Sequence, residues 1–438
     1  MTITAEGIAD RVLALGKASA YCVAFSGGPD SHALLHALAA VRTRLPAPLR
    51  AMHVNHGLHA QAPDWAAHCE QVSRLLHIPL VVAAVTGRPP ADAGETWARE
   101  QRYRLFSARL VASEMLLTAH HQDDQAETVL LRLLRGAGVD GLGGIPQVRA
   151  LGCGWVGRPL LDVPRSALQG YALRNDLRSL RDPGNDDLAA DRNFLRHRVL
   201  PLIAERWPQA DRSVSRAGAL LREGRGLLER YALSLERGAR RGEQLRCKPL
   251  RQLAPEEQRL VLRQWLRQQG LPLPDARQLE AGCAMLIQAR ADRTPEFLWP
   301  GGRVRRFRDA LIADAGRSST GNERHPRGAT WHGDRDLRLD GGWLRVLPGR
   351  GGLDPATIPA DGFAITYRAG GERCRPAGRP SRPLKKLFQE AGVPHWDRFH
   401  WPLLAADEGL AVIPGICVCE GYQAPRDQQG LMVIWEQD

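Results

Sequence analysis

The first half of the chain alternates short apolar runs with amphipathic stretches, and this rhythm restricts the fold more than any other feature. The short runs have the length and composition of buried strands, whereas the longer stretches repeat apolar residues at helical spacing. Strands are predicted at residues 21–25, 50–54, 80–85 and 115–119, and helices at 32–41, 64–76, 97–112 and 125–134. This β-α-β-α order predicts an α/β fold, a doubly wound parallel sheet with helices on both faces. In such sheets ligands bind outside the carboxyl ends of the strands, where most polar motifs of this chain fall.

The hexapeptide S-G-G-P-D-S, residues 26–31, stands between the first predicted strand and its helix. Its glycines let the backbone turn sharply and approach a ligand closely. The helix that follows directs free N–H groups and its positive dipole end toward this turn, which favours an anion. Ser26 and Ser31 add hydroxyl donors, and the lysine of a Walker-type P-loop is missing. A plain turn, with Asp30 or Ser31 as the helix N-cap, is the alternative that the pattern leaves open.

Two further polar motifs also follow predicted strands. The block H-V-N-H-G-L contains His53 and His56, for which ordinary hydrogen bonding is the alternative to ligand binding. The block H-H-Q-D-D-Q-A-E-T places Asp124 and Glu127 three residues apart, on one face of a helix. Such a carboxylate pair can hold a cation or an amine, and helix capping by the paired aspartates is the alternative.

Charge and cysteine usage narrow the class of partner and the compartment. The 60 basic residues outnumber the 48 acidic ones and give a net charge of +12, which favours nucleic acid as the partner. The eight cysteines form no C-x-x-C pair and no zinc-like array, as is typical of buried thiols in a reducing compartment. The N-terminus has no apolar signal segment, and no uncharged run is long enough to span a bilayer. We therefore expect a cytoplasmic protein without a membrane partner.

Three domains are predicted from the changes in pattern along the chain. Residues 1–210 form the α/β domain. Strand signals vanish after residue 210, and arginine-rich segments of helical period predict a small all-helical domain over residues 211–316. A polar, glycine-containing stretch over residues 317–334 is interpreted as a linker. Residues 335–438 combine short apolar runs with Pro/Gly turns and are predicted to form an α+β domain.

The motifs together resemble a known family. The hexapeptide matches the S-G-G-x-D-S loop of PP-loop ATPases, which cleave ATP between the α and β phosphates and adenylylate their substrates. The blocks H-V-N-H-G-L, H-H-x-D-D-x-x-E-T, R-G-x-G-x-x-G-L-x-G-I and R-N-x-L-R-H occur in the order found in tRNA(Ile)-lysidine synthetases, over residues 18–210. Residues 368–421 are similar to the C-terminal domain of that family. One departure is His59, which stands where the family usually has arginine and puts a nucleotide contact in doubt.

The resemblance implies a ligase that uses ATP and Mg²⁺ to join L-lysine to C2 of the wobble cytidine of tRNA(Ile) with a CAU anticodon. The cytosine O2 attacks the α-phosphate and pyrophosphate leaves; the lysine ε-amine then attacks C2 and AMP leaves. The residues expected to bind ATP are Ser26, Gly27, Gly28, Pro29, Asp30, Ser31, His53, His56 and Gly57. The expected catalytic residues are Asp30, Asp124, Glu127 and Arg196, with Asp30 as the metal ligand and Asp124 and Glu127 as the lysine site.

The transfer RNA is expected to bind mainly through its phosphates. The residues expected to contact it are Arg102, Arg192, Arg305, Arg306, Lys385 and Lys386. For any one of these side chains, a solvated surface position is the alternative. A homodimer is compatible with the sequence, which carries no readable interface signature.

Three other functions remain open at this point. One is an amidotransferase-type synthetase, against which the lack of a glutaminase-like N-terminal cysteine before the loop argues. A PP-loop tRNA thiolase would share the loop, but such enzymes usually need paired cysteines, and the missing C-x-x-C argues against this function. A non-catalytic ATP-binding or RNA-binding protein could retain the fold. The presence of Asp30, Asp124 and Glu127 together argues against a decayed site.

Overall fold

The computed structural model describes residues 2–57, 59, 61–86, 90, 94–180, 183–290, 293–315, 329–407 and 409–437. Two compact units make up the chain, Met1–Ala232 and Leu233–Asp438. The division between Ala232 and Leu233 falls inside the long helix α10 (Ala210–Ala239). The boundary predicted at residue 210 lies instead at the start of this helix. The boundaries of the three expected domains stay a prediction. Residues 316–328, most of the expected linker, and Leu58 of the second motif lie outside the described residues.

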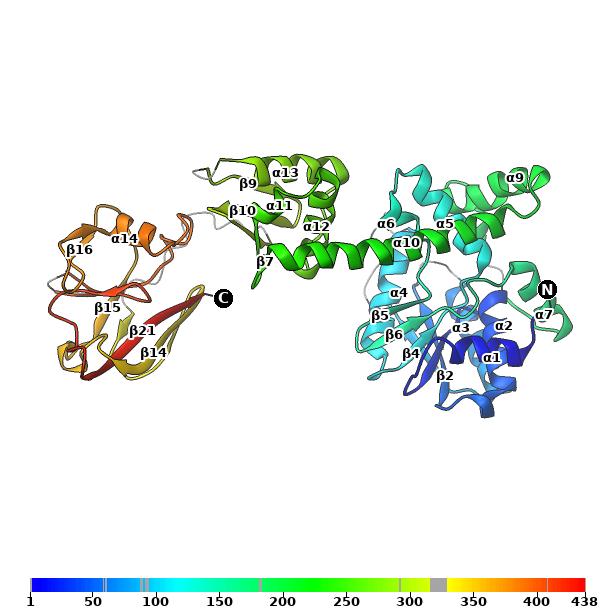
Figure 1. Cartoon of the computed structure of the whole chain (residues 1–438). Helices are drawn as coiled ribbons and strands as arrows, with labels where there is room; N and C mark the ends of the chain where they lie inside the picture. Colours follow the sequence, from blue (N-terminus) through cyan, green and yellow to red (C-terminus); the bar gives the residue numbers. More distant parts are fainter. Residues whose placement is uncertain are drawn as a thin grey trace. The chain divides into compact units, whose positions relative to one another are not determined.

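The first unit is built on a six-stranded sheet in the order β3-β2-β1-β4-β6-β5 (Figure 1). Its strands are β1 (Tyr21–Ala24), β2 (Leu49–Asn55), β3 (Leu80–Ala84), β4 (Met115–Leu117), β5 (Val148–Leu151) and β6 (Gly154–Gly157). All pairs are parallel except β5 with β6. The four predicted strands and the parallel sheet are confirmed, whereas the β5–β6 hairpin was not predicted. The chain order reverses between β1 and β4, so the ligand crevice of such a sheet lies at their carboxyl ends.

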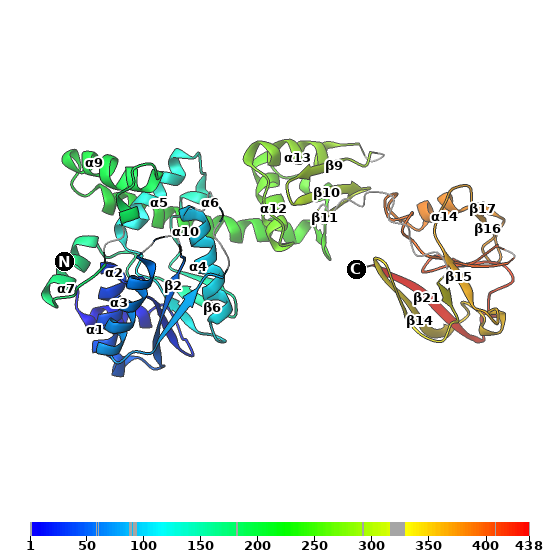
Figure 2. The same ribbon diagram turned by 180° about the vertical axis from the view of Figure 1, so that it is seen from behind.

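Helices cover both faces of this sheet (Figure 1), and Figure 2 shows them from behind. The α-helices of the first unit that precede α10 are α1 (Ala5–Leu13), α2 (Pro29–Ala40), α3 (Ala62–Leu75), α4 (Glu95–Arg109), α5 (Gln122–Leu134), α6 (Val139–Leu142), α7 (Arg165–Arg174), α8 (Asp191–Phe194) and α9 (Leu200–Arg206). Side chains of β1 alternate between the faces. Tyr21 and Val23 pack in the core that includes residues of α1, α2, α3 and α7, whereas Cys22 packs with Phe106 of α4. The predicted doubly wound arrangement is therefore confirmed.

The middle of the chain is not all-helical, and that part of the prediction is wrong. Helices α11 (Cys247–Leu250), α12 (Pro255–Gln268) and α13 (Ala276–Gln288) accompany a five-stranded sheet in the order β7-β8-β11-β10-β9. Its strands are β7 (Arg240–Arg241), β8 (Gln244–Arg246), β9 (Glu296–Trp299), β10 (Gly302–Phe307) and β11 (Ala310–Asp314). In β10 every second residue is buried, including Arg306. An arginine on the buried face of a strand hides the alternation of apolar and polar residues by which a strand is predicted.

The C-terminal part of the second unit mixes small antiparallel sheets with one α-helix, as predicted for an α+β domain. Strands β12, β15, β18, β19 and β20 form one sheet, β13, β14 and β21 form another, and β16 pairs with β17. The elements are β12 (Thr330–Trp331), β13 (Leu337–Leu339), β14 (Gly342–Arg350), β15 (Phe363–Thr366), β16 (Arg373–Cys374), β17 (Arg382–Pro383), α14 (Leu384–Glu390), β18 (Leu403–Ala406), β19 (Gly409–Ile413), β20 (Cys417–Val418) and β21 (Gln429–Gln437). Among the described residues, none of the helices combines the length and apolarity that a bilayer span requires.

Candidate active site at the carboxyl edge of the first sheet

The loop after β1 has the backbone geometry expected of an anion-binding turn. Gly27 has φ +84°, and a Cβ added there would lie 2.7 Å from Leu180 Cδ1, so only glycine fits without strain. The Ser26 and Ser31 hydroxyls are 3.0 Å apart, and the Gly28 N–H donates to Ser26 Oγ over 3.3 Å. Gly28 is the N-cap of α2 and makes no side-chain cap, while Pro29 occupies the first turn. The alternative of Asp30 or Ser31 as the N-cap is thereby excluded, and the first N–H groups of α2 stay available to an anion.

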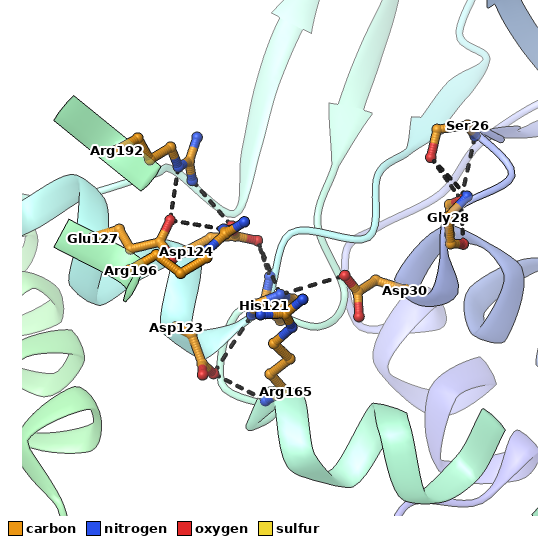
Figure 3. Close-up of polar contacts among 11 residues, drawn as sticks. Ser26, Gly28, Asp30, His121, Asp123, Asp124, Glu127, Arg165, Arg192 and Arg196 are labelled. Carbon is orange, nitrogen blue, oxygen red and sulfur yellow. Dashed lines mark hydrogen bonds and ion pairs between the residues drawn. The ribbon is translucent and has the colours of Figure 1, made fainter. Parts of the chain in front are cut away.

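Asp30 points from this loop toward His121 of the H-H-Q-D-D motif (Figure 3). Its Oδ2 lies 3.6 Å from His121 Nε2, while its buried Oδ1 has no hydrogen-bond partner among the described residues. A carboxylate oxygen without a partner, next to a phosphate-binding loop, is a suitable ligand for Mg²⁺. This ion is usually held by one or two protein carboxylates, and water and phosphate oxygens complete its coordination. No group of three or more His, Cys, Asp or Glu side chains in the described part of the chain could hold a metal ion unaided. The residues thus fit Mg²⁺ bound jointly with a nucleotide.

His121 links the loop to the acidic motif. It is buried, with ring nitrogens 3.5 Å from Asp123 Oδ2 and 3.6 Å from Asp124 Oδ2, besides its contact with Asp30. Burial lowers the pKa of His121, but Asp123, Asp30 and Asp124 outweigh burial and raise it to about 10. The three carboxylates thus favour the charged form of the imidazole that lies among them. Sequence reasoning quoted this histidine without giving it a role; the doubled H-H before D-D was the available signal.

Asp124 and Glu127 share one face of α5, as predicted, but neither is free. Arg192 donates to Glu127 Oε2 over 2.7 Å and to Asp124 Oδ1 over 3.0 Å. Arg196 donates to Glu127 Oε1 over 2.6 Å and to Asp124 Oδ1 over 3.2 Å (Figure 3). Two carboxylates thus face two guanidiniums, and the four charges cancel. Arg192, expected to contact tRNA, lies in this cluster beside Arg196, with its side chain 24% exposed.

The H-V-N-H-G-L motif at the end of β2 contains both buried residues with structural contacts and residues that face solvent. His53 is buried, with Nδ1 3.0 Å from the Phe25 carbonyl and 3.4 Å from Cys69 Sγ, so it holds β2 against the loop after β1. Arg102 Nε lies 3.3 Å from His56 Nε2, which joins α4 to the end of β2.

The rest of that motif forms a turn. Gly57 makes a positive-φ turn closed by Asn55 Oδ1. His59, at the place where an arginine is usual, stacks on Trp65 with ring centroids 5.0 Å apart.

The expected tRNA contacts of the second unit differ in accessibility. Arg306 is 1% exposed and donates to the carbonyls of Leu286, Ala289 and Arg308, so a role in direct tRNA contact is wrong. Its guanidinium satisfies carbonyl groups that the fold would otherwise bury without partners. Arg305 pairs with Asp314 and lies 4.2 Å from the Trp396 ring centroid. Lys385 and Lys386 are exposed on α14, as a phosphate contact requires.

Comparisons with known proteins agree with this geometry. Residues 3–203 match the model of the PP-loop domain, residues 245–312 the TilS substrate binding domain, and residues 363–435 the TilS substrate C-terminal domain. A tRNA(Ile)-lysidine synthase of Alkalilimnicola ehrlichii is 41% identical over 434 residues, covering 96% of this chain and 95% of that protein. The synthase of Coxiella burnetii is 39% identical over 98% of this chain and 95% of its own length. That of Pseudomonas aeruginosa is 42% identical over 91% of each chain. With relatives this similar along nearly the whole length, the chain belongs to the tRNA(Ile)-lysidine synthase family of ATP-using ligases.

Proposed function

We propose that this protein joins L-lysine to C2 of the wobble cytidine in the CAU anticodon of tRNA(Ile), with ATP converted to AMP and pyrophosphate. The observation that carries this proposal is the single cluster formed by Asp30 of the phosphate loop, His121, and the carboxylates of α5. A nucleotide on the loop after β1 would present its α-phosphate beside groups that can bind an amine and take its proton.

The first step makes the cytidine reactive. Cytosine O2 attacks the α-phosphorus of ATP, an O–P bond forms, and the bond to the β-phosphate oxygen breaks with release of pyrophosphate. The loop N–H groups and the Ser26 and Ser31 hydroxyls stabilise the charge that moves onto pyrophosphate. Asp30 would hold Mg²⁺, which supplies Lewis-acid neutralisation of the phosphate oxygens.

The second step replaces AMP by lysine. The ε-amine, with a pKa near ~10.4 in water, must lose a proton before it attacks C2. Asp124 and Glu127 are suited to hold the ammonium and accept that proton, but Arg192 and Arg196 already pair with them. We propose that the adenylylated base changes these pairings. Its new phosphodiester attracts one guanidinium away from the carboxylates, and the carboxylate oxygens that become free bind the lysine ammonium. AMP then leaves with the electron pair of the C2–O bond.

The test is a reaction of the purified protein with ATP, Mg²⁺, labelled lysine and unmodified tRNA(Ile) with a CAU anticodon. We expect ATP-dependent label in the RNA, no label in methionine tRNA, and loss of at least ~100-fold in rate for Asp30→Asn. Release of AMP without label in the RNA would mean that the base is adenylylated but that the second step uses a nucleophile other than lysine. Tight tRNA binding with neither label nor AMP would support a non-catalytic protein and refute the proposal.

Compartment and assembly are part of the same proposal. The eight cysteines are free thiols, which suits the reducing cytoplasm. A homodimer is compatible with the same chemistry, because each first unit carries the whole cluster. Light scattering of the purified protein gives its mass directly, and a monomer at micromolar concentration would remove the dimer from the proposal.

A further inference from the structure

A second polar cluster adjoins the active site and is dominated by arginine. Arg158 directly follows β6, while Tyr103 projects from α4 and Arg149 from β5. The guanidinium carbon of Arg149 lies 4.6 Å from the centre of the Tyr103 ring, and that of Arg99, also on α4, lies 5.1 Å from it. Arg158 also interacts with the Tyr103 side chain. Three guanidiniums thus converge on one phenol.

The charge of this cluster is not compensated within the described part of the molecule. Where the structure describes both partners, no ion pair joins Arg99, Arg149 or Arg158 to a carboxylate. Arg158 is 2% exposed; one of its nitrogens donates to the Pro146 carbonyl over 2.7 Å, while its buried Nε has no partner. Burial raises the pKa of Tyr103, but the three arginines outweigh it and lower that pKa. Concentrated positive charge of this kind is unfavourable unless an anion binds to it.

The cluster lies next to the reacting groups. Gly157, which precedes Arg158, accepts a hydrogen bond from the Thr118 N–H at the end of β4. Thr118 Oγ1 is in turn 2.8 Å from His120 Nδ1. Burial and the charges of Arg158, Arg192 and Arg99 hold the pKa of His120 well below its usual value. His120 therefore feels the charges of both groups of residues, Arg99 and Arg158 on one side and Asp124 and Arg192 on the other.

We propose that Arg99, Tyr103, Arg149 and Arg158 form a binding site for a phosphodiester of single-stranded RNA, beside the nucleotide whose base enters the active site. That this RNA is the anticodon loop of the substrate tRNA rests on the function proposed above. Arg99 and Arg149 are exposed, so the ligand approaches from solvent, as a backbone phosphate does. Arginine planes and a tyrosine ring are also the surfaces on which unstacked bases rest. The buried charge of Arg158 lies behind them and strengthens the attraction.

The carboxylate of free lysine is the other anion that this arginine cluster could bind. The experiment distinguishes an RNA phosphate from this carboxylate. The double variant Arg99→Ala/Arg149→Ala removes only exposed side chains, so folding is not at stake. Arg104→Ala is the matched control, an exposed arginine of the same helix α4 without contact to the Tyr103 ring. The affinity of each variant for an anticodon stem-loop RNA with the CAU anticodon is measured at several salt concentrations, without ATP or lysine. The KM for lysine is measured separately, beside that for 1,5-diaminopentane, which lacks the carboxylate.

We expect the double variant to raise the Kd for RNA roughly tenfold and to lower the salt slope by about 0.7 for each lost phosphate contact. The control keeps the wild-type slope. An unchanged slope in the double variant, or an equal drop in the control, overturns the proposal. A rise in the KM for lysine alone, with unchanged RNA binding and an unchanged KM for the diamine, assigns the cluster to the lysine carboxylate and also overturns it. Because RNA binding is measured without the reaction, a wild-type protein that binds RNA but ligates no lysine would refute the proposed function and leave this site standing.

Discussion

Glu127→Gln tests the charge balance on which the active site depends. Glu127 is 1% exposed and accepts hydrogen bonds from Arg192 Nε over 2.7 Å and from Arg196 Nε and Nη2 over 2.6 and 2.9 Å. The amide retains the shape but removes one negative charge, so two guanidiniums face Asp124 alone. Breaking a buried ion pair costs about 3–5 kcal/mol when the remaining charge is fully buried.

The expected loss here is smaller, because the arginine side chains are 24% and 20% exposed and keep Asp124 as a partner. Solvent screening and the remaining carboxylate reduce the cost to about 2 kcal/mol of unfolding free energy. For a unit of this size, ~2 kcal/mol lowers the unfolding midpoint by roughly 4–8 °C. We also expect the KM for lysine to rise at least ~10-fold, since one of two carboxylates for the ammonium is gone. The tRNA-dependent release of pyrophosphate should persist, because the phosphate loop is untouched.

Glu114→Gln is the matched control. Glu114 is fully buried and accepts from Arg50 Nε and Nη2 over 2.7 and 2.8 Å, but it lies at the opposite end of β4 from the site. Calorimetry should give a similar fall of the midpoint for both variants, and steady-state kinetics below the transition should change for Glu127→Gln alone. An unchanged KM for lysine in Glu127→Gln, or the same change in both variants, would refute the assignment of this carboxylate to lysine.

Three further outcomes follow from the geometry. Gly27→Ala should raise the KM for ATP about tenfold, since a Cβ at φ +84° costs ~1–2 kcal/mol and meets Leu180, and unchanged ATP kinetics would contradict ATP binding at the loop after β1. Arg306→Met should lower the unfolding midpoint of the second unit, by leaving carbonyl groups unsatisfied, without altering the salt slope of tRNA binding; a lowered slope would show a direct phosphate contact. Burial lowers the pKa of His36 and His68 below 6.5 in the folded chain, so the unfolded chain takes up protons first as the pH falls. His121, whose pKa is raised, acts in the opposite direction. The double variant His36→Gln/His68→Gln, unfolded in urea at pH 7.5 and 5.5, should therefore lose less stability at the acid pH than the wild type, and an equal change in both proteins would mean that these imidazoles are solvated.

Much of the first unit could be predicted from local pattern. The strands at 21–25 and 115–119 are apolar runs followed by polar turns, and a parallel sheet necessarily brings their carboxyl ends to one edge. Asp30 and the acidic pair of α5 were assigned to one site from this rule together with the family resemblance, and the structure places His121 between them. The β5–β6 hairpin was missed because glycine and exposed arginine interrupt its apolar pattern.

The sequence by itself determined the α/β fold, the glycine turn after the first strand and the family, because strand and helix periods and the order of the motifs are local properties of the chain. Only the tertiary structure decided which charges neutralise each other. Arg192 and Arg306 look like surface cations in the sequence, yet one lies on the active-site carboxylates and the other on buried carbonyls. The convergence of Arg99, Arg149 and Arg158 on one tyrosine likewise joins residues up to 59 positions apart, from Arg99 to Arg158. A side chain's electrostatic partner is set by long-range packing, and no local pattern of residues encodes it.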